Sequence, residues 1–307
     1  MVKRGRMATH DANHDDQVPR RCKPIFVIGH YRSGTTWVAN LLEAHPDVYT
    51  PTHPEHHGQH ESAFFSSLLP YCSWGRTEQD RIAMQAIFEC SDYWHLLFPQ
   101  DPPEVDAAAL TPDAYFRECM DLAARRRGCS CWVEKTPTHT LLLGYLLKIF
   151  PDALFVAVER NGQDVVRSYM FNSADPYSIW GWATRAMMVV VFQKVIHRYR
   201  ASVINVRYED LRDRPEKTLQ SLYAHLNLRI PDTSGSRWPA NSSFNSAPVR
   251  VPLRFRVTVT LVSWIFKFVP GTLCEQIGLR HFRDTKNKTL PDWFFHVFKG
   301  RYGGVSR

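Results

Sequence analysis

The 307-residue sequence lacks the long apolar segment of a membrane-spanning helix, because no run of about 18 consecutive apolar residues occurs in it. Its first 21 residues, MVKRGRMATHDANHDDQVPRR, are polar throughout and lack the apolar stretch of a secretory signal peptide. These absences predict a soluble, cytoplasmic protein without a transmembrane segment, in which residues 1–22 form a flexible tail. A Golgi enzyme trimmed of its membrane anchor is the alternative that the sequence leaves open.

A regular cysteine pattern is also missing. The seven cysteines are odd in number and irregularly spaced, and the closest pair, Cys129 and Cys131, stands too close together for a metal-binding knuckle. We therefore expect reduced, mostly buried thiols. The other five are Cys22, Cys72, Cys90, Cys119 and Cys274.

Signatures of nucleic-acid binding are absent as well. The formal net charge of +8 fits a polyanionic ligand, an acidic substrate, a nucleic acid or an anionic membrane surface. The basic residues are scattered, however, and neither zinc-finger spacing nor an aromatic RNA-binding motif is present. The sequence therefore argues against a nucleic-acid partner.

Short apolar runs that alternate with helical periodicity are what the sequence does contain. Such alternation predicts an α/β protein with three layers, in which helices flank a central, mainly parallel sheet and ligands bind at the carboxyl ends of the strands. The predicted strands are 25–29, 131–135, 153–160 and 202–211. The predicted helices are 35–44, 112–127, 138–150, 163–171, 180–200 and 214–226.

The C-terminal part has a less regular pattern of apolar residues. We expect one domain over 23–307, with 229–307 a less regular helical or lid region. The stretch PLRFRVTVTLVSWIFKFVPG, at 252–271, favours a helix or lid packed on the core, and peripheral membrane contact through 251–275 is the alternative.

The clearest motif is PIFVIGHYRSGTTW at 24–37, an apolar strand followed by a glycine-rich turn and a helix. Gly29 and Gly34 bracket a turn whose backbone amides can surround an anion, and the next helix adds its positive end. A nucleoside-triphosphate loop would carry a lysine directly after the second glycine, where this sequence has Thr35. The motif thus predicts an anion cradle that differs from an ATP loop.

Four stretches together resemble the superfamily of sulfotransferases that use 3′-phosphoadenosine-5′-phosphosulfate (PAPS). GHYRSGTTW, followed by LLEAHPDVY, resembles the 5′-phosphosulfate loop of that family. The other three, in chain order, are WVEKTPTH at 132–139, FPDALFVAVERNGQDVVRSYM at 150–170 and VRYEDLRDRPEKTLQSLYAHLNL at 206–228. The resemblance is closer to the bacterial, heparan-type and tyrosylprotein branch than to the cytosolic phenol-type enzymes.

The resemblance implies transfer of a sulfuryl group from PAPS to a hydroxyl, or less readily to an amine, with release of adenosine 3′,5′-bisphosphate (PAP) and without a metal. Arg32 and Lys135 would stabilise the leaving group, and Arg160 with Ser168 would bind the 3′-phosphate. The remaining donor-binding positions are Ser33, Gly34, Thr35, Thr36 and Trp37. Arg160 is followed by Asn-Gly where many relatives have Asp-Pro, which alters the turn but keeps the arginine.

The residue types alone leave simpler roles open. Lys135 could be a solvated lysine at a strand end, and Arg160 could pair with Glu159 or Asp164 at the surface. Trp74, Tyr93 and Trp94 could line an acceptor pocket or belong to the core.

The general base is sought in THPEHHGQHESAFF, because relatives place a glutamate just before an aromatic pair. Glu61 is the first choice, followed by Glu55 and His60. A metal site is the alternative use of this segment, although a substrate loop is favoured. The histidines at metal-like spacing are His53, His56, His57 and His60.

The acceptor stays open among small molecules, glycans and lipids that carry a hydroxyl. Two other functions also stay open: an ATP- and magnesium-dependent kinase-like phosphotransferase, and a non-catalytic nucleotide-binding relative.

Overall fold

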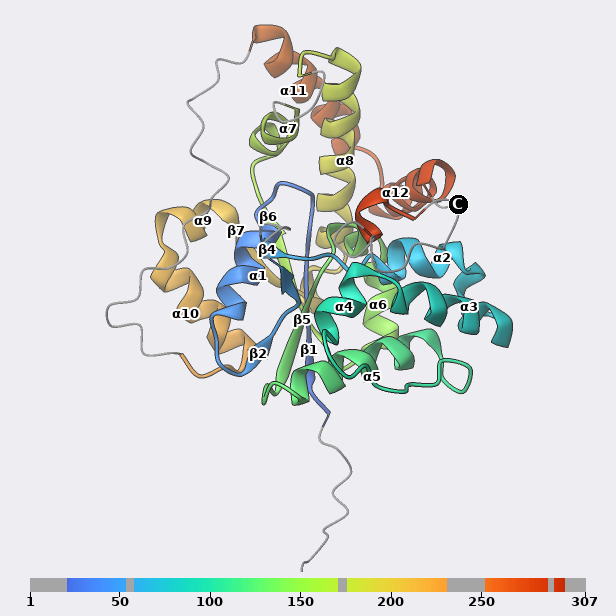
Figure 1. The fold of residues 1–307 in the computed structure, drawn as a ribbon. Helices are drawn as coiled ribbons and strands as arrows, with labels where there is room; N and C mark the ends of the chain where they lie inside the picture. The colour runs from blue at the N-terminus through green and yellow to red at the C-terminus, as the bar shows by residue number, and fades with distance from the viewer. Residues whose placement is uncertain (1–20, 54–57, 171–175, 231–251, 287–289, 296–307) are drawn as a thin grey trace, which may run out of the picture.

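A five-stranded parallel sheet forms the centre of the protein, here in a computed structural model that describes residues 21–53, 58–170, 176–230, 252–286 and 290–295. The strand order is β2-β5-β1-β6-β7, and every neighbouring pair is parallel (Figure 1). The strands are β1 Lys23–Gly29, β2 Val48–Tyr49, β5 Cys131–Lys135, β6 Leu154–Glu159 and β7 Ile204–Arg207. A two-stranded antiparallel ribbon is formed by β3 Thr52–His53 and β4 Gly58–Gln59.

The central strand β1 is buried on both faces. Ile25 and Val27 belong to one apolar cluster, whereas Phe26 and Ile28 belong to another. Successive side chains of a strand point to opposite faces, so this split places one core on each side of the sheet. The continuous apolar run of β1 follows from this double burial.

Helices α1 Thr35–Glu43 and α10 Pro215–Leu226 cover the first face. Val38 and Leu42 of α1 and Leu219 and Tyr223 of α10 are fully buried there. The Tyr223 hydroxyl donates to the carbonyl of Leu41 at 2.9 Å and so joins the two helices. The short helix α9 Tyr208–Asp213 completes this layer.

The second face carries a large aromatic core. Phe26 stacks on Phe155 at 5.1 Å and meets the Trp132 ring edge-on at 5.6 Å. The indole N–H of Trp132 donates to Asp121 at 2.6 Å, which satisfies the buried donor. The helices on this side are α2 Leu69–Tyr71, α3 Glu78–Glu89, α4 Asp92–Leu97, α5 Pro112–Arg125 and α6 Leu143–Ile149. The fold is therefore the predicted three-layer α/β arrangement.

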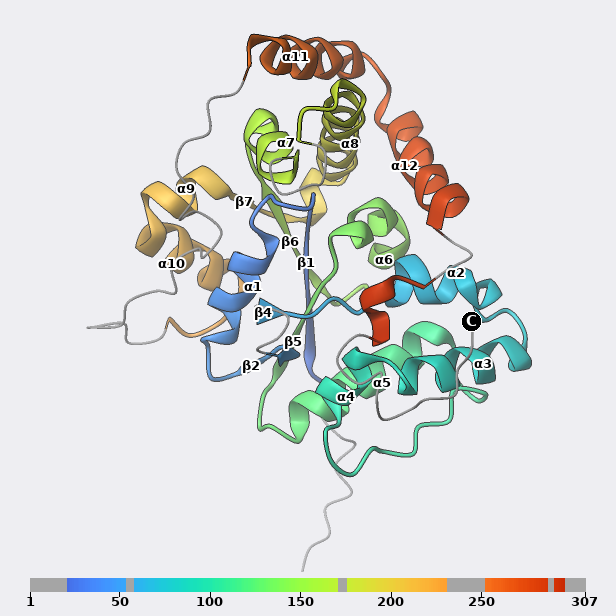
Figure 2. The same ribbon diagram turned by 45° about the horizontal axis from the view of Figure 1, so that its top comes forward.

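A third group of helices lies beyond the carboxyl ends of the strands, as Figure 2 shows. Its members are α7 Gly162–Met170, α8 Ile179–Arg198, α11 Leu253–Lys267 and α12 Gly271–Lys286. A separate apolar cluster joins α7, α8 and α11, with Trp182 packed edge-on against Phe255 at 5.1 Å. The sequence 252–271 thus packs on the domain through α11.

Two predicted elements were wrong in their extent. The strand expected over 202–211 ends at Arg207, and α9 begins at Tyr208, where Glu209 and Asp210 favour the positive end of a helix. The helix expected over 138–150 begins as a 3₁₀ segment, Pro137–Leu142, and becomes α-helical only at Leu143. There the Thr140 hydroxyl is bonded to both the N–H and the carbonyl of Gly29, which ties the tighter turn to the end of β1.

The remaining short helical turns are a π-helix at Phe64–Leu68 and 3₁₀ segments at Ser73–Gly75, Arg200–Ser202 and Asp292–Phe295. Within the ranges described above, no single helix combines the length and apolar content needed to cross a bilayer. Together α11 and the first part of α12 reach that composition, with a bend of 118° between them.

All seven cysteines are free thiols, and five of them are buried.

Candidate active site

The loop between β1 and α1 has the backbone of an anion cradle. Arg32 and Gly34 have positive φ values of 68° and 102°, and Gly29 has φ 150°. A Cβ atom on Gly29 would lie 2.5 Å from the carbonyl oxygen of Val158, and one on Gly34 would lie 2.7 Å from the Tyr208 ring. Glycine is therefore required at both ends of the loop. The first amides of α1 have no carbonyl acceptor within the helix and face the loop interior.

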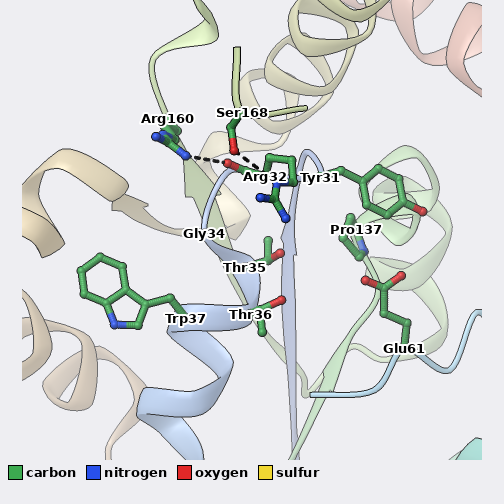
Figure 3. Close-up of a pocket in the computed structure, with 10 residues that line it drawn as sticks. All are labelled: Tyr31, Arg32, Gly34, Thr35, Thr36, Trp37, Glu61, Pro137, Arg160 and Ser168. Atoms are coloured by element: carbon green, nitrogen blue, oxygen red, sulfur yellow. Dashed lines mark hydrogen bonds between the residues drawn. The ribbon is translucent and has the colours of Figure 1, made fainter. Parts of the chain in front are cut away.

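A pocket of about 160 Å³ opens at this helix start (Figure 3). It brings together segments that lie far apart in the sequence: the β1–α1 loop, the segment before the π-helix, the end of β5, the end of β6 and α7. Its lining residues are Tyr31, Arg32, Gly34, Thr35, Thr36, Trp37, Glu61, Pro137, Arg160 and Ser168.

Two arginines meet on one side of the pocket. The Arg160 guanidinium donates to the carbonyl of Arg32 at 3.0 Å and lies over the ring of Tyr208, 4.2 Å from its centroid. The Arg32 Nε donates to the Ser168 hydroxyl at 3.2 Å. Burial lowers the pKa of Arg160, which is only 7 % exposed and so has lost most of its water. An anion in the pocket would interact with this cation more strongly than with a solvated one.

A carboxylate and an ammonium group meet on the other side. Lys135, at the end of β5, donates to Glu61 at 2.9 Å. The lysine is 4 % exposed, whereas the glutamate side chain is 21 % exposed and reaches the pocket. Lys135 is therefore not the solvated strand-end lysine that its residue type alone would allow. It enters the site through Glu61, because it does not itself line the pocket.

A buried hydrogen-bond network holds Glu61 against β5. Glu134 accepts hydrogen bonds from Ser62 at 2.7 Å, from Thr136 at 2.5 Å and from His139 at 2.8 Å. Burial by itself would raise the pKa of Glu134, but the His139 charge and these three donors lower it below its usual value. The Ala63 amide also donates to Thr136, at 3.2 Å. The residues on both sides of the Glu61–Lys135 pair are thereby fixed.

The structure thus brings Arg32, Gly34, Thr35, Thr36, Trp37, Glu61, Arg160 and Ser168 to one pocket, with Lys135 bound to Glu61. Ser33 is the exception among the predicted residues. Its amide donates to the His30 carbonyl at 3.0 Å within the turn, and Ser33 does not line the pocket. The Ser33 hydroxyl is buried, and no partner for it occurs in the described part of the chain.

Sequence reasoning missed several residues of the site. Tyr31 and Pro137 line the pocket, and Glu134, Ser62 and Thr136 form the network behind it. Burial and the nearby Glu61 charge raise the pKa of Tyr31, so its phenol stays protonated. All five lie within two positions of a predicted residue, but nothing in their spacing shows which way their side chains point.

Other candidates lie elsewhere. Tyr93 and Trp94 are buried in the core, and the half-buried Trp74 packs against that core, edge-on to Tyr145. None of the three lines the pocket at the start of α1. His60 is buried, with its ring 6.1 Å from that of Tyr93.

Three of the expected candidates, Glu55, His56 and His57, fall outside the described ranges, as does the side chain of His53. Among the residues that are described, no group of three or more histidine, cysteine or acidic side chains could hold a metal.

These features define a class of protein: a parallel α/β fold whose first strand-to-helix loop is an anion cradle, with an arginine from the neighbouring strand beside it. The model of the Sulfotransferase family matches residues 24–232, so the chain belongs to that family. The matched residues contain the whole pocket.

Three curated relatives are similar to the chain over about two thirds of its length or more. The chain is 27% identical over 247 residues to omega-hydroxy-beta-dihydromenaquinone-9 sulfotransferase Stf3 of Mycobacterium bovis, a match that covers 67% of this chain and 63% of that protein. It is 24% identical over 320 residues to nodulation protein NoeE of Sinorhizobium fredii, with 89% and 72% covered. A match to protein-tyrosine sulfotransferase 1 of Danio rerio shows 24% identity, with 66% and 53% covered. The chain thus spans just under two thirds of the Stf3 length.

Solved structures that match the chain include two bacterial sulfotransferases. The sulfotransferase domain of the Synechococcus olefin synthase has a TM-score of 0.48 at 17% identity, with 89% of this chain and 97% of that one covered. Sulfotransferase STF1 of Mycobacterium tuberculosis has a TM-score of 0.42 at 16% identity, with 84% and 76% covered.

Proposed function

We propose that this protein is a PAPS-dependent sulfotransferase that transfers a sulfuryl group to the hydroxyl of an acceptor and releases PAP. The observation that carries the proposal is one pocket with the helix start of the cradle between two arginines on one side and the Glu61–Lys135 pair on the other. Membership of the Sulfotransferase family supports it.

The cradle suits the 5′ end of such a donor. Thr35 and Thr36 offer backbone amides and hydroxyls at the positive end of α1. The buried Ser33 hydroxyl, which has no protein partner in the described ranges, offers one more polar group beside the loop. Arg32 lines the same pocket, and its planar guanidinium suits phosphate and sulfate oxygens.

Arg160 and Ser168 suit the 3′-phosphate. They come from the end of β6 and from α7, and each forms a hydrogen bond with Arg32. A 3′-phosphate there would accept from the Arg160 guanidinium and the Ser168 hydroxyl. This group distinguishes PAPS from ATP, so these two residues should select the donor.

Glu61 suits the role of general base. Its carboxylate reaches the pocket, and Lys135 holds it at 2.9 Å while Ser62 and Ala63 fix the backbone beside it. In this role Glu61 takes the proton of the acceptor hydroxyl as the oxygen attacks sulfur, and Arg32 stabilises the charge that develops on the leaving phosphate oxygen. Lys135 acts through Glu61, whose carboxylate it holds in place. The donor supplies the activated sulfuryl group.

The acceptor is proposed only as a hydroxyl compound. One relative is an omega-hydroxy-beta-dihydromenaquinone-9 sulfotransferase and another is a protein-tyrosine sulfotransferase, so hydroxyls of both kinds are candidate acceptors for this chain. The substrate-binding segments of a fold vary most among relatives.

Ligand-dependent thermal stability tests the proposal. PAP should raise the melting temperature of the protein, whereas ATP with magnesium should raise it much less. The reverse order would favour the kinase-like alternative. If PAP stabilises the protein but no sulfated product forms from PAPS and a cell extract, the non-catalytic alternative would stand.

Two variants separate binding from chemistry. Arg160→Ala should weaken PAP binding measured by calorimetry, whereas Arg212→Ala, at an exposed arginine outside the pocket, should leave it unchanged. Lys135→Ala should lower turnover more than PAP affinity, because it releases the Glu61 carboxylate from its fixed position and leaves the donor-binding residues in place. Undiminished PAP affinity in Arg160→Ala would remove the 3′-phosphate assignment.

A further inference from the structure

Helix α11 is apolar on two opposite faces. On one face, Phe255 and Val259 are each 1 % exposed and pack on α7 and α8. On the other, large apolar side chains repeat every three to four residues and stay in solvent, which defines an apolar stripe. The stripe residues are Leu253, Val257, Leu261, Trp264, Ile265 and Phe268, and each is 48 to 74 % exposed. A helix buried through one face needs only one apolar face, so the stripe requires another explanation.

Helix α8 packs alongside α11. Trp182 contacts Phe255, and the Lys194 ammonium donates to the carbonyl of Lys267 at 2.7 Å. These contacts align α8 and α11 side by side in the same direction. Trp180 therefore lies at the same end of the pair as Leu253, and at 84 % it is the most exposed large apolar side chain among the described residues. An exposed apolar row such as the stripe of α11 marks an interaction site.

The charge around the stripe identifies the partner. From 233 to 274 the sequence contains no acidic residue, whereas five basic residues occur there. They are Arg237, Arg250, Arg254, Arg256 and Lys267, of which the last three lie on α11 and are exposed. Apolar residues including tryptophan, flanked only by cations, are typical of helices that lie in the interface of an anionic membrane. A symmetric pair of chains would instead bring these like charges together.

We propose that α11 docks the protein flat on an anionic membrane surface. The stripe enters the headgroup region, and Arg256 and Lys267 contact the lipid phosphates. The helix is held parallel to that surface because its other face is anchored on α8.

Docking would place the pocket close to the membrane. Gln163 of α7 donates to Thr260 of α11 at 3.1 Å, and Ser168, one and a half turns further along α7, lines the pocket.

The membrane proposal does not depend on the sulfotransferase proposal, because vesicle binding needs neither donor nor acceptor.

Vesicle flotation tests the proposal with the full chain. The protein should float with vesicles of phosphatidylcholine and phosphatidylglycerol, and much less with phosphatidylcholine alone, and added salt should release it. Leu261→Ser with Trp264→Ser should weaken the binding at least ~10-fold, since both side chains would enter the interface. Arg256→Gln with Lys267→Gln should weaken it about 25-fold, at about fivefold for each charge.

Matched controls come from exposed residues on other elements. Tyr71→Ser with Ile82→Ser removes apolar groups of similar exposure from α2 and α3, and Arg207→Gln with Arg212→Gln removes two exposed charges from β7 and α9. Both controls should bind vesicles like the unmodified protein. Thermal melts of all variants should match, because every changed side chain is exposed.

Three results would overturn the proposal. The first is that the protein does not float with anionic vesicles, and the second is that the control variants lose as much binding as the test variants. The third is that the charge variant and the stripe variant both stay bound to the vesicles in high salt. A different result would assign the stripe to a second copy of the chain. In that case the protein would not bind vesicles, sedimentation velocity would show dimers that depend on protein concentration, and Leu261→Ser with Trp264→Ser would abolish them.

Discussion

The substitution Gly34→Ala tests how tightly the cradle is built. Gly34 has φ 102°, and a methyl group there would lie 2.7 Å from the ring of Tyr208. Left-handed backbone costs alanine about 1–2 kcal/mol, and forcing a methyl group into a filled site costs about 1–3 kcal/mol more. We expect the free energy of unfolding, measured by urea denaturation, to fall by about 2–5 kcal/mol.

Gly128→Ala is the matched control, because Gly128 has φ 72° but no atom within 4 Å of the added methyl group. It should lose only the backbone part, about 1–2 kcal/mol. The difference between the two variants measures the clash with Tyr208, which Tyr208→Leu in the Gly34→Ala background should relieve in part. Equal losses at Gly34 and Gly128, or no rescue by Tyr208→Leu, would refute the close contact between loop and ring.

Two further predictions concern buried titratable groups. Burial lowers the pKa of His30 from 6.5 to about 4, so the folded state binds fewer protons than the unfolded one, and stability should fall by about 3 kcal/mol as the pH drops from 6.5 to 4. His30→Gln should flatten that part of the curve of unfolding free energy against pH, and an unchanged curve would contradict the assignment. Glu134→Ala leaves His139 buried without its carboxylate and should cost about 3–5 kcal/mol at neutral pH. Because the pKa of Glu134 is lowered, the stability that its carboxylate contributes is present above its unfolded pKa and is lost as the pH falls through its folded pKa. The loss of unfolding free energy in Glu134→Ala should therefore become smaller in acid. A loss that does not depend on pH would count against the network.

Much of the fold follows from local patterns. The strands at 25–29 and 131–135 are predicted because apolar runs bounded by turns are typical of buried parallel strands, and β5 has the predicted bounds. The cradle is predictable for the same reason, since two glycines after such a strand constrain the loop whatever surrounds it. The site residues of these segments meet because parallel strands end at the same edge of the sheet.

What the sequence does not predict depends on contacts between distant segments. The 3₁₀ turn at Pro137–Leu142 replaces the expected helix start because Thr140 bonds to Gly29, 111 residues earlier. The buried Glu134 joins Ser62, 72 residues away, and nothing in either local pattern pairs them. The exposed stripe of α11 was ambiguous for a similar reason: periodicity shows that a helix has apolar faces, but only the packing shows which face the domain covers.

Tyr208 joins the β1–α1 loop to Arg160. Its ring contacts the position that a side chain on Gly34 would need, meets the Trp37 ring edge-on at 5.5 Å and lies under the Arg160 guanidinium at 4.2 Å. The early end of β7 is what brings it there, because α9 begins at Tyr208 itself, directly beside the end of β6. A tyrosine that reads as structural in the sequence thus sets the spacing between the helix start and Arg160. Changes at Tyr208 should therefore alter the binding of both ends of an anionic ligand together.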